Sequence, residues 1–173
     1  MADIIKIIKT IPGIDIDSFK KGLNCPRFWM ACIKDLHKVD IQNIGTNGLH
    51  WEITAHFLLD PLGVTKIPVE TSQDLLWKED EGFNGDGFKW DYWVENSDAI
   101  TEATGILFFK PSGNDVKIML QVTKMDLKAG FLDVAGLGKS MIIKRLEQEL
   151  QKMVKNLIAI TTAGEVKPLL LDC

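Results

Sequence analysis

The fold is decided by the stretch from Leu137 to Ile160, LGKSMIIKRLEQELQKMVKNLIAI, which is the only long unbroken helical pattern in the sequence. Its apolar residues recur at spacings of three and four, the period of one face of an α-helix, and they are Ile142, Ile143, Leu146, Leu150, Met153, Leu157 and Ile160. The opposite face carries charged and amide side chains. This pattern predicts a long helix that buries one side and leaves the other in water.

The hundred residues before this helix read mostly as strands. The clearest is Leu49 to Leu58, where apolar residues alternate with His50, Glu52, Thr54 and His56. Other strands are predicted over Leu36 to Ile44, Val64 to Trp77, Phe88 to Val94, Ile100 to Lys110 and Val116 to Lys124. Asn47-Gly48 is typical of a hairpin turn, and Pro68 suggests an edge strand or a kink.

The N-terminal segment is less regular. Asp3 to Ile11 fits neither period cleanly, but its isoleucine content favours a strand. Pro12-Gly13 then breaks the chain, and two short helices are expected, one capped by Asp15 or Asp17 and reaching Leu23, the other from Pro26 to Ile33. The sequence therefore predicts one α+β domain over residues 1–173, closed by a short C-terminal tail, 161–173, that could dock on the body.

The composition excludes several classes of protein. With 46% hydrophobic and 25% charged residues the chain is globular, and a net charge of −4 without a basic cluster argues against nucleic acid as a partner. No apolar window is long enough to span a membrane. The three cysteines, Cys25, Cys32 and Cys173, lack metal-ligand spacing, and no secretory signal is evident, so a reducing cytoplasm is expected with Cys25 and Cys32 as two packed thiols.

This order of elements resembles the helix-grip superfamily. One strand, two short helices and six further strands, about seven in all, lead into a long C-terminal helix. The resemblance is carried by Asp15 to Leu36, where the second short helix opens at Pro26-Arg27-Phe28-Trp29, and by Phe108 to Ile160, where a hairpin leads through glycines into the closing helix. The superfamily includes START-like lipid transfer domains, birch-pollen-allergen proteins, polyketide cyclases and coenzyme Q-binding proteins. The resemblance implies a curved antiparallel sheet around the helix, with a hydrophobic cavity between them.

Aromatic side chains on the inward strand faces are the best sign of a ligand site, because pockets for apolar ligands have such linings. Tyr92 is the only tyrosine and would supply the first polar contact. The same side chains could instead fill a solid core. The predicted ligand-binding residues are Trp51, Ile53, Phe57, Phe88, Trp90, Tyr92, Ile118, Leu120, Leu146 and Leu150.

No metal, cofactor or catalytic set is predicted. His50, Glu52 and His56 line one strand face, but a rise of ~3.3 Å per residue places His56 roughly 13 Å from Glu52, too far for one ion. Glu102 and Asp98 are the carboxylates near an inward strand end, although both suit exposed hairpin positions equally well.

Three functions remain open. The first is the binding or transport of a hydrophobic small molecule, such as a lipid, quinone or polyketide, gated by the loops at Pro61 to Lys66 and Gly130 to Gly136. The second is a cyclase-like or dehydratase-like enzyme in which Tyr92 or Glu102 moves a proton. The third is a chaperone-associated interaction module that uses Trp93 and the acidic loop Glu79 to Asp86. Transient contact with a protein or a membrane is compatible with each of them.

Overall fold

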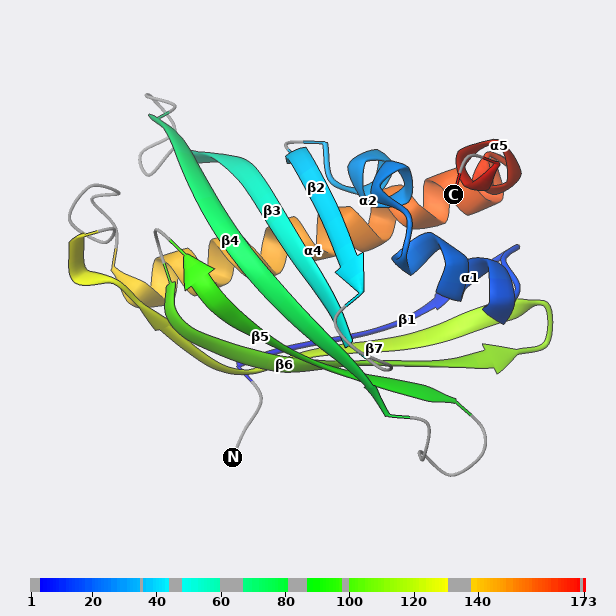
Figure 1. The fold of residues 1–173 in the computed structure, drawn as a ribbon, viewed down its shortest axis with the longest axis horizontal. Coiled ribbons are helices and arrows are strands. Elements are labelled where there is room, and N and C mark those ends of the chain that lie inside the picture. The colour runs from blue at the N-terminus through cyan, green and yellow to red at the C-terminus, as the bar shows by residue number, and fades with distance from the viewer. Residues whose placement is uncertain are drawn as a thin grey trace.

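The structure is a computed structural model that describes residues 4–34, 36–43, 48–59, 67–80, 87–97, 100–130, 138–171 and 173. For residues 37, 38, 40–43, 48–59, 67–80, 95 and 96 the description covers the backbone but not the side chains. Within these ranges the strands form one antiparallel sheet in the order β1-β7-β6-β5-β4-β3-β2, and a long helix follows near the C-terminus (Figure 1). The predicted combination of an antiparallel sheet and a closing helix is confirmed.

Each strand from β2 to β6 lies beside the strand that follows it in the sequence, whereas β1 joins the far edge next to β7. The chain must therefore cross from one edge of the sheet to the other between β1 and β2, and two short helices, α1 (Ile16–Leu23) and α2 (Pro26–Cys32), lie in this crossing. The strands are β1 (Ile5–Ile11), β2 (Leu36–Asn43), β3 (Gly48–Leu59), β4 (Ile67–Asp80), β5 (Phe88–Ser97), β6 (Ile100–Ser112) and β7 (Asp115–Leu127).

The long helix α4 (Lys139–Thr162) runs across the inside of the curved sheet (Figure 1). Its predicted first residue, Leu137, lies outside the described residues, and the helix continues two residues past the predicted end at Ile160. A further short helix, α5 (Val166–Leu170), occupies the segment predicted as a tail. It docks on the body, because Val166 and Leu170 are both buried.

The inward faces of β6 and β7 follow the alternation expected of a half-buried strand. On β7 the buried residues are Val116, Ile118, Leu120 and Val122. On β6 the adjacent phenylalanines point to opposite faces, so Phe109 is fully buried and Phe108 is only partly covered. The side of β6 and β7 that faces the core is therefore apolar.

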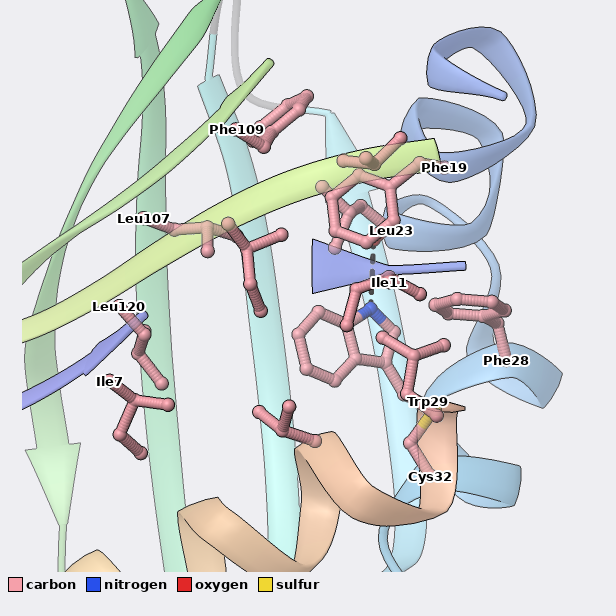
Figure 2. Packing of buried hydrophobic residues seen from close by; sticks show 14 of the residues in the cluster. Ile7, Ile11, Phe19, Leu23, Phe28, Trp29, Cys32, Leu107, Phe109 and Leu120 are labelled. Carbon is pink, nitrogen blue, oxygen red and sulfur yellow. Dashed lines mark hydrogen bonds between the residues drawn. The ribbon is translucent and has the colours of Figure 1, made fainter. Parts of the chain in front are cut away.

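Short-range contacts hold α1 and α2 in place. Asp15 caps α1 by accepting hydrogen bonds from the Ser18 backbone N–H and hydroxyl, both at 2.8 Å. Gly22 lets α1 approach α2 closely, because a Cβ there would come within 2.9 Å of the Phe28 ring. Trp29 Nε1 donates to the Leu23 carbonyl at 2.9 Å, the dashed line in Figure 2.

The most tightly packed part of the core lies under α1. Phe109 is at its centre, with ring centroids 5.1 Å from Phe19, 5.4 Å from Phe88 and 5.9 Å from Trp90. Figure 2 shows Phe19 and Phe109 among the side chains that fill this end of the molecule. Aromatic pairs at these separations stabilise a core beyond the apolar area that they bury.

One expectation needs correction. Cys25 and Cys32 are not a pair of packed thiols, because Cys25 forms a disulfide with Cys173 and Cys32 is free and buried. The tertiary fold alone brings residues 148 positions apart together, so no local pattern could show it.

Pro68, expected at an edge strand or a kink, lies in β4, which has a neighbour on each side in the sheet order. In the described pairing β5 contacts β4 only from Gln73 onward, so Pro68 itself is paired on the β3 side alone, where it has the surroundings of an edge position.

Candidate ligand site between the sheet and the C-terminal helix

The packing of α4 changes along its length. In its C-terminal half, Val154, Leu157 and Ile160 are buried. In its N-terminal half Ile142 is buried, but Ile143, Leu146 and Leu150 keep part of their surface accessible to solvent, as does Met153 in the following turn. Among the described elements, α4 makes its closest backbone approaches to α2 and β1. The helix is therefore seated firmly near its C-terminal end and less tightly over the middle of the sheet.

The inward face of β5 is also only partly covered. Trp90 is 1% exposed and belongs to the aromatic cluster around Phe109, and Lys20 Nζ lies 3.7 Å above the centre of the neighbouring Phe88 ring. Phe88, Tyr92 and Val94 are only partly buried. On this face of β5 the accessible apolar surface therefore lies on both sides of Trp90.

Tyr92 lies flat against the next strand. It pairs in register with Gly105 on β6, where a Cβ would collide with the tyrosine ring and hydroxyl and with the Gln121 carbonyl oxygen. The hydroxyl reaches across β6 and donates a hydrogen bond of 2.8 Å to that carbonyl on β7. Burial raises the pKa of the phenol well above its ordinary value. Tyr92 is therefore a neutral group held by the backbone, and its proton is already engaged.

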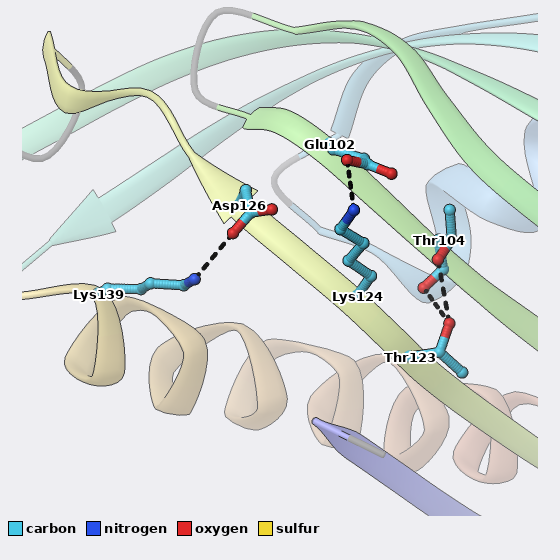
Figure 3. Close-up of polar contacts among 6 residues, drawn as sticks. All are labelled: Glu102, Thr104, Thr123, Lys124, Asp126 and Lys139. Carbon is cyan, nitrogen blue, oxygen red and sulfur yellow. Dashed lines mark hydrogen bonds and ion pairs between the residues drawn. The ribbon is translucent and has the colours of Figure 1, made fainter. Parts of the chain in front are cut away.

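A β-bulge accompanies this arrangement. The β6–β7 register shifts between Thr104 and Gly105, which pair with Lys124 and Val122, so Thr123 is skipped. The Thr123 hydroxyl fills the irregularity, since it lies 3.0 Å from the Thr104 hydroxyl and donates to the Thr104 carbonyl at 3.1 Å (Figure 3). Side-chain hydroxyls therefore hydrogen-bond backbone carbonyls on both sides of the bulge.

An ion pair links the first turn of α4 to the sheet. Lys139 Nζ, in the first turn of α4, lies 3.0 Å from Asp126 Oδ1 near the end of β7 (Figure 3). Both side chains are about half exposed, so the pair contributes little to stability in water. The helix begins at Gly138 without a side-chain cap. Its N-terminal end is consequently the more weakly held of the two.

The groups considered for proton transfer do not meet in this region. Glu102 is half exposed and forms a 2.7 Å ion pair with Lys124 (Figure 3), an arrangement typical of a surface carboxylate. Asp98 lies outside the described residues. Tyr92 uses its hydroxyl proton in the bond to β7. Neither Tyr92 nor Glu102 is thus placed as a free general acid or base.

The predicted ligand residues divide into three groups. Tyr92, Leu146 and Leu150 are partly buried, the first on β5 and the other two on α4. Phe88 and Trp90 belong to the aromatic cluster around Phe109. Ile118 and Leu120 are buried in β7. The side chains of Trp51, Ile53 and Phe57 lie outside the description, as do those of His50, Glu52 and His56 and the loops 61–66, 81–86 and 131–137.

Sequence reasoning missed the two groups that fix Tyr92, namely Gly105 and the Gln121 carbonyl. A glycine inside a strand pattern was an available signal, because it often marks the close approach of another group. No sequence signal could have identified the carbonyl acceptor, since every residue carries a backbone carbonyl.

Solved structures of similar shape support the fold. A protein from Thermus thermophilus superposes with a TM-score of 0.64 at 13% identity, covering 92% of this chain and 97% of that one. The Zhui aromatase/cyclase from a Streptomyces species gives 0.63 at 11% identity, over 91% and 92% of the two chains. A STAR-related lipid transfer protein from Xanthomonas axonopodis gives 0.58 at 9% identity, over 90% and 88%.

Comparisons of the sequence with known families and curated proteins find no match: no protein-family model matches it, and no curated protein matches it significantly. Within the described part of the chain, no helix has the length and apolarity needed to cross a membrane. The similarity therefore rests on architecture, and the chain has the helix-grip fold in common with START-like and aromatase/cyclase structures.

Proposed function

We propose that this protein binds one hydrophobic small molecule between the sheet and the N-terminal half of α4. The observation that carries the proposal is the partial accessibility of apolar side chains on both elements, Leu146 and Leu150 from the helix and Tyr92 and Val94 from β5. A core normally packs such residues to the density of an organic crystal. Apolar surface left accessible inside a fold is costly, and an apolar ligand that covers it would recover that cost.

The ligand class follows from the chemistry of these surfaces. The named side chains present hydrocarbon and one aromatic ring, and the phenol proton is donated to Gln121. We expect a largely apolar molecule, such as a lipid, quinone or polyketide. The titles of two structural neighbours, a lipid transfer protein and an aromatase/cyclase, agree with this class.

Binding is favoured over catalysis as the function of this site. A cyclase or dehydratase must move a proton, and the positions of Tyr92 and Glu102 supply no free group for that step. The conservative variant Tyr92→Phe separates the two functions, since it would abolish turnover that depends on the phenol but would leave most of the apolar contact intact.

The proposal is tested by titrating the protein with a dansyl-labelled fatty acid and following dansyl emission. Binding between the sheet and α4 predicts a saturable, blue-shifted dansyl emission with one site per chain. The variant Leu150→Trp should reduce the amplitude or the affinity at least fivefold, because the larger side chain would occupy the same space. The matched control is Gln148→Trp, which places the same indole on the exposed side of the helix.

A folded protein that gives no saturable signal would refute the proposal. Equal affinities for the wild type and Leu150→Trp would move binding to another part of the molecule. Trp90→Ala is a poorer probe, because Trp90 is packed on Phe109 and its truncation would cost about 3–5 kcal/mol of folding energy. A loss of binding there would not distinguish a ligand contact from a collapsed core.

A further inference from the structure

A covalent link joins the C-terminus to the corner between α1 and α2. Cys25, the residue before α2, forms a disulfide with Cys173, and their Cα atoms are 5.5 Å apart, within the range usual for such bonds. The carbonyl oxygen of Leu169 lies 3.8 Å from the Cys25 sulfur and 3.6 Å from the Cys173 sulfur. Both sulfurs thus lie against the same backbone carbonyl on α5.

The link fastens an element that little else holds. α5 has five residues, too few for a helix to persist alone in water. It follows a turn at Gly164, which has a φ of 72°, and it rests on α1 and α2 through Val166 and Leu170. Its place in the fold therefore depends on these two apolar side chains and on the bond at Cys173.

The two sulfurs differ sharply in access. Cys173 is exposed at the end of the chain, whereas Cys25 is 0% exposed beneath α5. The third cysteine, Cys32, is buried in α2, and burial raises the pKa of its thiol to about 12. A soluble thiol or disulfide can therefore reach Cys173 directly, while Cys32 remains protonated and does not compete.

Leu169 of α5 also packs against the core, and the disulfide adds a covalent link to these apolar contacts. We propose that Cys25 and Cys173 form a thiol–disulfide exchange site that fastens and releases α5, and that its substrates are low-molecular-weight thiols and disulfides. For closure, the Cys173 thiolate attacks one sulfur of a small disulfide RS–SR and releases RS⁻. The Cys25 thiolate then attacks the Cys173 sulfur of the mixed disulfide and releases the second RS⁻. The protein dithiol is oxidised by two electrons and RS–SR is reduced to two thiols.

Opening is the reverse sequence. A small thiolate attacks the exposed Cys173 sulfur, and Cys25 leaves as a thiolate that takes up a proton in its buried site. A second thiolate attacks the mixed disulfide and frees Cys173. The disulfide no longer holds α5, and the surface of α1 and α2 under Val166 and Leu170 becomes accessible each time the helix detaches.

Hydrogen exchange followed by mass spectrometry tests this site in the full-length protein. Samples equilibrated with oxidised or reduced glutathione would be compared over the amides of α5, with those of β7 as an internal reference. Disulfides of long loops contribute enough stability that we expect roughly thirtyfold faster exchange of α5 after reduction, with β7 unchanged. Alkylation should label only Cys32 in the denatured oxidised protein and all three cysteines after reduction.

The variants Cys173→Ser and Cys32→Ser sharpen the test. Cys173→Ser should show fast exchange of α5 in both glutathione buffers, and Cys32→Ser should respond to reduction as the wild type does. The proposal is overturned if α5 exchanges equally fast in both buffers in the wild type. It is also overturned if oxidised glutathione leaves all three thiols free for alkylation.

Discussion

Leu150 and Leu157 provide a direct test of how tightly α4 is packed. They are the same residue type, seven positions apart on the same face of one helix, yet Leu157 is 7% exposed whereas Leu150 is only partly buried. Replacing each in turn by tryptophan adds a similar volume at the two sites. The outcomes should differ because the surroundings differ.

The expected magnitudes follow from that contrast. At Leu157 the added volume enters a filled core, and overpacking costs about 1–3 kcal/mol. For a domain of this size each kcal/mol lowers the melting temperature by roughly 2–4 °C, so Leu157→Trp should lose roughly 2–12 °C. At Leu150 the indole can occupy accessible space and cover apolar surface, and we expect a change within roughly 2 °C, or a gain.

Differential scanning calorimetry and urea unfolding of the two variants and the wild type would measure these changes. Urea slopes equal to that of the wild type would show that the native and denatured states are otherwise unchanged. The reasoning fails if Leu150→Trp is destabilised as much as Leu157→Trp, because the space between helix and sheet would then already be filled.

Three further predictions concern the elements that shape the site. Gly105→Ala should lower the free energy of unfolding by about 2–4 kcal/mol, from overpacking and from loss of the Tyr92 hydrogen bond to Gln121. The control Gly130→Ala has open space around its Cβ position and should leave stability unchanged. Chemical unfolding of both variants would measure the difference. Tyr92→Phe should lose about 1–3 kcal/mol at neutral pH by leaving a backbone acceptor without its donor. Because burial raises the pKa of Tyr92 in the folded state, the unfolded chain ionises first, at about pH 10. Wild-type stability should therefore fall more steeply than that of Tyr92→Phe as pH rises above 10, and equal slopes between pH 9 and 12 would contradict the burial of the phenol. Asp15→Ala should lower the free energy of unfolding by about 0.5–2 kcal/mol, because it removes the cap of α1. Hydrogen bonds from Ser18 hold the pKa of Asp15 below its ordinary value, so the stability difference between variant and wild type should shrink as pH falls below the ordinary pKa of an aspartate. A stability difference that stayed constant down to pH 2 would argue against the cap.

The sequence predicted the parts of the fold that depend on periodicity. The spacing of Leu146, Leu150 and Leu157 predicted the closing helix, and the alternation from Val116 to Val122 predicted which side of β7 is buried. Asp15 was one of two candidates for the helix cap, and the bond from Ser18 identifies it. These features are set by residues close together in the chain, so local patterns carry them.

Features that join distant segments were beyond such patterns. The disulfide between Cys25 and Cys173 depends on where the C-terminus lies after folding. The same is true of the hydrogen bond from Tyr92 to Gln121, which spans three strands and supports the sheet. Inward-facing residues could be named from alternation, but whether they fill a core or line a cavity depends on the separation of helix and sheet, which periodicity does not encode.

The central claim is that a hydrophobic molecule binds between the sheet and α4. Mass spectrometry of the protein purified from its own host tests this claim most directly. A native spectrum would be compared with that of the denatured chain, and the released material would be extracted and identified. We predict a stoichiometric apolar compound of the lipid, quinone or polyketide class. A protein whose native mass equals that of the bare chain, and which also fails to take up the dansyl-labelled fatty acid, would contradict the account and favour a filled core.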